Sequence, residues 1–165
     1  MKNNKGFSLV ELIIVIAIMA ILVGVMAPQL IKYIEKTNVS ADTQLADSVK
    51  TAITTTIMDP AVINKHGDQV ASAQKVTTWT PVASLQGDST DATTVKGGVE
   101  EILGFTIASA STKLKSSAKA NAGEIQYSMV DGNTVAVAIT NSDITGKKAP
   151  STQTNFITVG TDGYK

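Results

Sequence analysis

A single carboxylate, Glu11, stands near the start of an otherwise apolar segment. From Phe7 to Ile31 the only other polar side chains are those of Ser8 and Gln29. A carboxylate inside a membrane-spanning helix costs about 2.5–3.5 kcal/mol on insertion scales, and more when it lacks a partner. Glu11 is therefore the residue most in need of a positively charged or hydrogen-bonding partner, and the first candidate for a functional role.

The apolar segment that carries Glu11 is long enough to cross a lipid bilayer. As a helix, positions 7–31 span about 37 Å at about 1.5 Å per residue, and a bilayer hydrocarbon core is about 30 Å thick. Lys2 and Lys5 precede the segment, and basic residues favour the cytoplasmic side. We expect one span, with the C-terminal part of the chain outside the cytoplasm.

Two ordinary interpretations of this N-terminus remain open. A secretory signal peptide would be cleaved after Val-Met-Ala at residues 25–27, although Pro28 directly after the cut and Glu11 within the apolar run disfavour it. A simple one-span anchor explains the length of the segment. It leaves Gly6, Phe7 and Glu11 without a role.

Residues 5–13, KGFSLVELI, resemble the processing site of prepilins, the precursors of type IV pilins, type II secretion pseudopilins and competence pilins. The shared pattern is a glycine, an aromatic residue, a glutamate four residues after it, and a long apolar run. The resemblance extends over residues 1–36. It implies that a dedicated prepilin peptidase cleaves between Gly6 and Phe7, and that the new N-terminus at Phe7 is methylated.

The same resemblance implies that Glu11 neutralises the Phe7 amine of a neighbouring subunit during filament assembly. A free α-amine has a pKa of about 7.7–8.0 and is largely cationic at neutral pH. The two groups would then form a charge pair inside an apolar bundle and set the register of one helix against the next. Removing one member of a buried pair leaves the other uncompensated, at about 3–5 kcal/mol.

Pro28 matches the proline of the family's membrane helix. We expect a kink there, because proline removes one backbone donor and clashes with the preceding turn. Many pilins carry a glycine midway along this helix, whereas this chain has Ala20, with Gly24 nearby. This difference concerns how far the helix unwinds in a filament.

The composition of the chain, 165 residues with 14 basic and 14 acidic side chains, indicates one membrane helix and one domain with its own core. There is no cysteine, so the domain must be held together by packing alone. Every residue counted as basic is a lysine. Without arginine or interleaved aromatic residues, this set disfavours a nucleic-acid partner.

Residues 32–59 predict an amphipathic continuation of the helix. An apolar stripe recurs at four-residue intervals, at Leu45, Val49, Ile53 and Ile57. Charged residues, Asp42 among them, are expected mostly off this stripe. The proline of Asp59-Pro60 is expected to end the helix.

Residues 60 to about 100 are polar and rich in turn-forming pairs, Gly97-Gly98 among them. The pattern predicts a turn-rich segment, and the resemblance to pilins implies that it is the variable loop that joins helix to sheet. Within it we expect a short strand over residues 76–79 and a helical turn over residues 99–103.

The clearest β signal is a pair of alternating runs, 124–130 and 134–140, around Asp131-Gly132-Asn133, which predicts a hairpin. Residues 105–107 and 155–159 are candidate flanking strands, and 109–123 are expected to form a solvated loop or short helix. The expected fold is therefore α+β, with a long N-terminal helix packed on a small antiparallel sheet.

No residue set indicates an enzyme. The one histidine, His66, is expected in a surface loop, and no serine lies in a Gly-x-Ser-x-Gly context. Residues 88–91, Asp-Ser-Thr-Asp, are a weak calcium candidate, and Trp79 is expected to serve packing. Five lysines are interpreted as solvated side chains and not as DNA contacts: Lys113, Lys115, Lys119, Lys147 and Lys148. We expect no catalytic residue, cofactor or metal.

We interpret the chain as the structural subunit of a type IV pilus, a surface filament for adhesion, motility or aggregation. The expected parts are a leader at 1–6, a transmembrane and polymerisation helix at 7–31, its amphipathic continuation at 32–59, and a head of variable loop and sheet at 60–165. Expected partners are identical subunits in a helical filament, the prepilin peptidase, a platform protein, an assembly ATPase and the membrane. The chain would lie in the cytoplasmic membrane as a single-pass precursor and then in an extracellular pilus.

Three alternatives remain. A pseudopilin of a type II secretion system or a competence pilin would share the N-terminal chemistry. A membrane-anchored exported binding domain would not need Glu11.

Overall fold

The structure is a computed structural model that describes residues 7–116, 124–130, 132, 134–140 and 155–158. The chain divides into two compact units, residues 1–37 and residues 38–165. The helices are α1 (Leu9–Met58), α2 (Pro60–Gln74) and α3 (Val95–Leu103), with short 3₁₀ segments η1 (Val82–Ser84) and η2 (Ile107–Lys113). The strands are β1 (Thr80–Pro81), β2 (Glu124–Met129), β3 (Val135–Thr140) and β4 (Asn155–Thr158). The expected α+β fold is confirmed.

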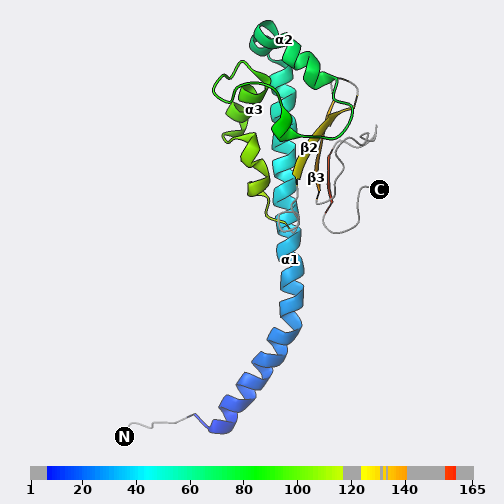
Figure 1. The fold of residues 1–165 in the computed structure, drawn as a ribbon. Helices are drawn as coiled ribbons and strands as arrows, with labels where there is room; N and C mark the ends of the chain where they lie inside the picture. The colour runs from blue at the N-terminus through cyan, green and yellow to red at the C-terminus, as the bar shows by residue number, and fades with distance from the viewer. Residues whose placement is uncertain (1–6, 117–123, 131, 133, 141–154, 159–165) are drawn as a thin grey trace. The chain divides into compact units, whose positions relative to one another are not determined.

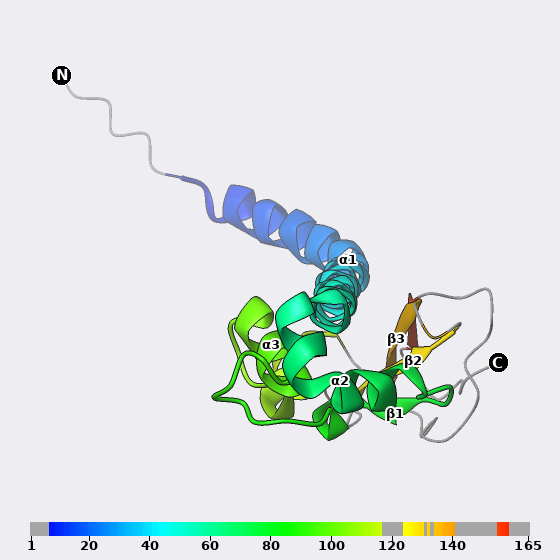
Figure 2. The same cartoon turned by 90° about the horizontal axis from the view of Figure 1, so that it is seen from above.

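Within the second unit, the end of α1 forms the centre of the domain. Figures 1 and 2 show α3 on one side of this part of α1 and the strands β2 and β3 on the other. The predicted apolar stripe is confirmed, because Val49 and Ile53 are fully buried and Ile57 is nearly so. Small side chains widen the stripe: Ala46, Ala52 and Thr56 are also buried.

The helix α1 ends at Met58, as the proline at position 60 predicts. The same proline also begins α2, so the loop expected from residue 60 onward is wrong for residues 60–74. The Asp59 side chain accepts a hydrogen bond from the Ala61 amide at 2.8 Å and caps α2, with Pro60 in the first turn. Aspartate before proline is a helix start signal as much as a stop signal, because proline needs no donor at the first helical position.

The pair Gly97-Gly98 lies inside α3 and not in a turn, and α3 is longer than the single helical turn expected there. The Thr94 hydroxyl caps α3 by accepting a hydrogen bond from the Gly97 amide at 3.1 Å. At Gly98, an added Cβ would lie 2.7 Å from the Cγ2 atom of Thr56 on α1. The absence of a side chain at Gly98 therefore allows α3 to approach α1 closely.

The predicted hairpin is confirmed. Strands β2 and β3 pair antiparallel from Glu124 opposite Thr140 to Met129 opposite Val135. Gly132, in the connecting turn, has a φ of 74°, a conformation that glycine adopts without steric cost. The apolar pairs Ile125–Ile139 and Tyr127–Val137 lie in the cluster that includes the buried residues of α1.

The sheet order is β1-β2-β3-β4. The strand expected at residues 76–79 lies instead at β1, which pairs antiparallel with β2 through Thr80 and Tyr127. The strand expected over 155–159 is present as β4, and it pairs parallel with β3. The sheet is therefore antiparallel over its first three strands and parallel at the fourth.

The strand expected at residues 105–107 is wrong. Gly104 caps α3 with a φ of 71°, and the chain then enters η2. The Ile107 amide donates to the buried carboxylate of Glu100 at 2.8 Å. This contact fastens the segment to α3. The 3₁₀ segment η2 confirms a short helix at the start of residues 109–123, of which 117–123 lie outside the described residues.

Asp42 is an exception to the expectation that charged residues avoid the buried face of α1. It is only 1% exposed. Its two carboxylate oxygens accept hydrogen bonds from the amides of Lys115 and Ser116, at 2.8 and 3.0 Å. A carboxylate with both oxygens bonded to amides is stable in a buried position, and it fastens the end of the η2 region to α1.

We predict that Asp42→Ala lowers the free energy of unfolding by about 2–4 kcal/mol, because each orphaned buried donor costs about 1–3 kcal/mol. Urea unfolding of the full chain in detergent, followed by circular dichroism, would measure this change. Asp47→Ala is the matched control, since Asp47 is an exposed aspartate on the same helix. Equal stabilities of the two variants would contradict the role given to Asp42.

Candidate assembly site at the start of the first helix

Glu11 lies in the first turn of α1 and its carboxylate is bonded to the backbone of the same chain. The Ser8 amide donates to Glu11 Oε2 at 2.9 Å, and the Leu12 amide lies 3.3 Å from the Ser8 carbonyl oxygen. Ser8 directly precedes α1, so this is the glutamate half of a capping box. The carboxylate is thereby held next to the residue that follows Phe7.

The S-x-x-E spacing of a capping box is readable in the sequence, and the sequence analysis did not use it. It gives Glu11 a second role besides charge pairing. The Phe7 side chain is 82% exposed, and Gly6 lies outside the described residues. Phe7 and Ser8 are not helical.

The residues after Glu11 carry a continuous apolar surface. Among the described residues, α1 is the one helix long and apolar enough to cross a membrane, and its most apolar window buries nothing within the structure. Leu9, Ile21 and Ile31 are between 68% and 73% exposed. An apolar surface of this extent requires lipid or other protein surfaces to cover it.

Pro28 lies inside α1, and the residues on both sides of it are helical. The kink expected at Pro28 stays a prediction.

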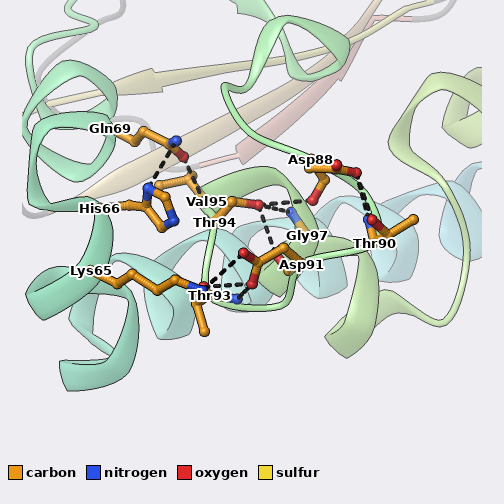
Figure 3. Close-up of polar contacts among 10 residues, drawn as sticks. All are labelled: Lys65, His66, Gln69, Asp88, Thr90, Asp91, Thr93, Thr94, Val95 and Gly97. Atoms are coloured by element: carbon orange, nitrogen blue, oxygen red, sulfur yellow. Dashed lines mark hydrogen bonds and ion pairs between the residues drawn. The ribbon is translucent and has the colours of Figure 1, made fainter.

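The loop before α3 contains the two aspartates considered as calcium ligands (Figure 3). Asp88 Oδ1 accepts from both the amide and the hydroxyl of Thr90, each at 2.9 Å. Asp91 Oδ1 accepts in the same way from Thr93, and Lys65 Nζ lies 3.1 Å from Asp91 Oδ2. Within the described part of the chain, no group of three or more acidic or histidine side chains is arranged to hold a metal ion.

These contacts shift the acidity of both aspartates. Hydrogen bonds from Thr93, with a contribution from Lys65, lower the pKa of Asp91 to about 2. Hydrogen bonds from Thr90 lower the pKa of Asp88 below its usual value. Each donor favours the ionised carboxylate, so both aspartates act as anionic caps of the turns that lead into α3.

His66 was expected in a loop and lies within α2, at a residue whose backbone leaves helical values (φ −136°, ψ 44°). Its neighbour Gln69 connects two elements (Figure 3). Gln69 Nε2 lies 3.4 Å from His66 Nδ1, and Gln69 Oε1 accepts from the Val95 amide at 3.2 Å. These atoms link α2 to the start of α3, which is a structural role.

Trp79 is fully buried against Ala136 and Ala138, as expected for a packing residue. Lys113 lies over the Phe105 ring, with Nζ 4.6 Å from the ring centroid. Lys119, Lys147 and Lys148 lie outside the described residues.

Comparison with known proteins gives a consistent set of relatives. A family model described as the prokaryotic N-terminal methylation motif matches residues 1–27. The type IV major pilin protein PilE1 of Neisseria gonorrhoeae is 30% identical over 160 residues, covering 90% of this chain and 93% of that protein. The type IV major fimbrial protein FimA of Dichelobacter nodosus is 33% identical over 104 residues, covering 63% of this chain.

A fimbrial protein of Moraxella nonliquefaciens is 47% identical over 55 residues, or 33% of this chain. The matched segments span 36% of the Moraxella protein and 61% of the Dichelobacter protein. No solved structure gives a significant match.

We predict that the loop before α3 loses stability in acid. The pKa of Asp91 is depressed in the folded state, so its contribution is fully present above the unfolded value near 3.8. That contribution disappears as the pH falls towards about 2. The stability difference between the wild-type chain and Asp91→Asn, measured by urea unfolding, should therefore shrink between pH 5 and pH 2.

Asp68→Asn is the control, because Asp68 is an exposed aspartate of α2 outside this loop. A difference between wild type and Asp91→Asn that does not change with pH would refute the assignment.

Proposed function

This chain belongs to the type IV pilins, and we propose that it is the structural subunit of a pilus filament. The observation that carries the proposal is the combination at the start of α1. A glutamate is held at the helix N-terminus, and a helical surface that buries nothing of its own follows it. Lipid can cover this surface in one state and the helices of other subunits in another. Both surroundings are apolar, so transfer between them need not expose the helix to water.

We propose the following role for each part of the chain. Residues 1–6 are a leader, and residues 7–31 are the membrane span and the polymerising helix. Residues 32–59 continue that helix into the head, and residues 60–165 form the head and the outer surface of the filament. The buried stripe on α1 between residues 46 and 57 supports this division, because it begins only after the apolar span has ended.

The match to the methylation motif over residues 1–27 supports processing between Gly6 and Phe7. The helix begins at Leu9, so the scissile bond lies before the first hydrogen-bonded turn. A peptidase could therefore reach this bond without unwinding the helix. Methylation of the new Phe7 amine leaves it basic and able to carry a positive charge.

Assembly then depends on Glu11 and the Phe7 amine of a neighbouring subunit. The Ser8 amide binds one carboxylate oxygen of Glu11, so the side chain is already oriented when the neighbour arrives. In apolar surroundings the attraction between this carboxylate and the amine is stronger than in water. The pair would hold adjacent helices in one register.

The remaining expectations concern partners and location. We propose that the precursor is a single-pass protein of the cytoplasmic membrane with its head outside, and that the assembled pilus is extracellular. A prepilin peptidase, a platform protein and an assembly ATPase would act on it. The role is structural, without catalysis or cofactor.

The first test is the intact mass and N-terminal peptide of protein sheared from the cell surface. We predict a chain that begins at Phe7 and carries one added methyl group. Recovery by shearing would support a surface pilus over a pseudopilus. A chain that begins at Pro28 would show an ordinary signal peptide and refute the processing proposal.

The second test concerns Glu11. We predict that Glu11→Ala reduces sheared pilin by about 100-fold or more, because an uncompensated buried charge costs about 3–5 kcal/mol. The precursor should still reach the membrane in normal amount, as judged by immunoblotting of membrane fractions. Glu35→Ala, which removes a glutamate further along α1, is the control and should retain filaments. Normal filaments from Glu11→Ala would refute the assembly role given to Glu11.

A further inference from the structure

A cluster of polar side chains marks the place where the apolar run of α1 ends. We name it the outer polar cluster: Gln29, Lys32, Tyr33 and Lys36. Its members recur at helical spacing and line a shallow hollow of about 230 Å³ on one face of α1. Tyr33 is 66% exposed, and Lys36 Nζ lies 5.8 Å from the centroid of its ring.

The position of the cluster along the helix matches the thickness of a bilayer. Between Glu11 and Lys32 the helix carries no charged side chain. Residues 12–31 span about 30 Å at about 1.5 Å per residue, which equals the hydrocarbon core. When Glu11 lies at the inner boundary of the core, Lys32 therefore lies at the outer boundary, at the level of lipid phosphates.

The chemistry of the cluster suits an anion. Two ammonium groups, a phenol hydroxyl and an amide are all donors, and Glu35 lies at the edge of this face by helical spacing. Lys32 and Lys36 are separated by one turn, a spacing at which like charges repel each other. An anion placed between them would remove this repulsion. Tyrosine is enriched at membrane interfaces, where its ring lies at headgroup level.

We propose that the outer polar cluster binds the phosphate of an anionic phospholipid in the outer leaflet and holds the unassembled subunit at a fixed depth. The inference rests on the proposed function, in which the subunit is stored in the membrane before assembly. At this depth Glu11 stays in the inner headgroup layer, and it enters apolar surroundings only when the subunit joins a filament. The lipid contact must be released at that step.

The test uses the full chain reconstituted in nanodiscs of phosphatidylcholine containing a minority of phosphatidylglycerol. Native mass spectrometry after detergent extraction counts the lipids that remain bound to the protein. The double variant Lys32→Gln/Lys36→Gln should retain less phosphatidylglycerol by about fivefold or more, because each lysine near an anionic surface contributes measurably to binding. The matched control, Lys75→Gln/Lys96→Gln, removes the same charge from the head and should match the wild type.

Two results would overturn the proposal. The first is equal retention of phosphatidylglycerol by the wild type and the Lys32→Gln/Lys36→Gln variant. The second is its loss from the wild type on addition of inorganic phosphate, which would identify a site for free phosphate.

Flotation of each sample with phospholipid vesicles distinguishes failure of the outer polar cluster from failure of the membrane-stored subunit. A chain that floats but shows no lipid preference refutes only the outer polar cluster. A wild-type chain that does not float refutes the membrane-stored subunit itself.

Discussion

The rest of this structure depends on one constraint. The apolar surface at the start of α1 is not covered by the chain itself and must be stable all the same. The features of the chain near the N-terminus all meet this constraint. The helix satisfies its own backbone groups, except at Gly24, whose carbonyl lacks the amide donor that Pro28 cannot supply. The one carboxylate in the run lies in the first turn, where it accepts from the Ser8 amide and also interacts favourably with the positive end of the helix dipole. The polar side chains of this segment, Ser8, Glu11 and Gln29, lie near its two ends, where a partner can reach them.

In the head, the same helix is packed against other parts of the chain. There its apolar face is covered by the antiparallel hairpin on one side and by α3 on another, and the contacts are close. Gly98 allows α3 to approach Thr56, while Asp42 fastens the backbone of residues 115 and 116 to α1. One continuous element therefore carries the proposed membrane span at one end and forms the centre of a core at the other. The two environments require opposite surfaces, and the change from one to the other occurs along a single helix.

In the proposed function, the capping box also bears on when the subunit assembles. A glutamate that already accepts from its own backbone needs no partner while it lies near the headgroups, so the subunit can wait in the membrane at little cost. Transfer into an apolar filament removes the water around the carboxylate and strengthens its attraction to a cationic partner. The charge pair is therefore most favourable in the filament, where it would hold adjacent helices in register.

The sequence alone determined the local features of this protein. The apolar run, the glutamate four residues after Phe7, the stripe on residues 45–57 and the hairpin around Gly132 all follow from spacing and residue type within a short window. The end of α1 at Met58 followed in the same way, although the helix that begins at Pro60 was not predicted, because this proline was interpreted only as a stop. Tertiary structure decided what depends on distant partners. The burial of Asp42 requires two amides more than seventy residues away. The parallel pairing of β4 with β3 likewise has no local signal, because hydrogen bonds between distant strands are chosen by packing and not by the residues beside them in the chain.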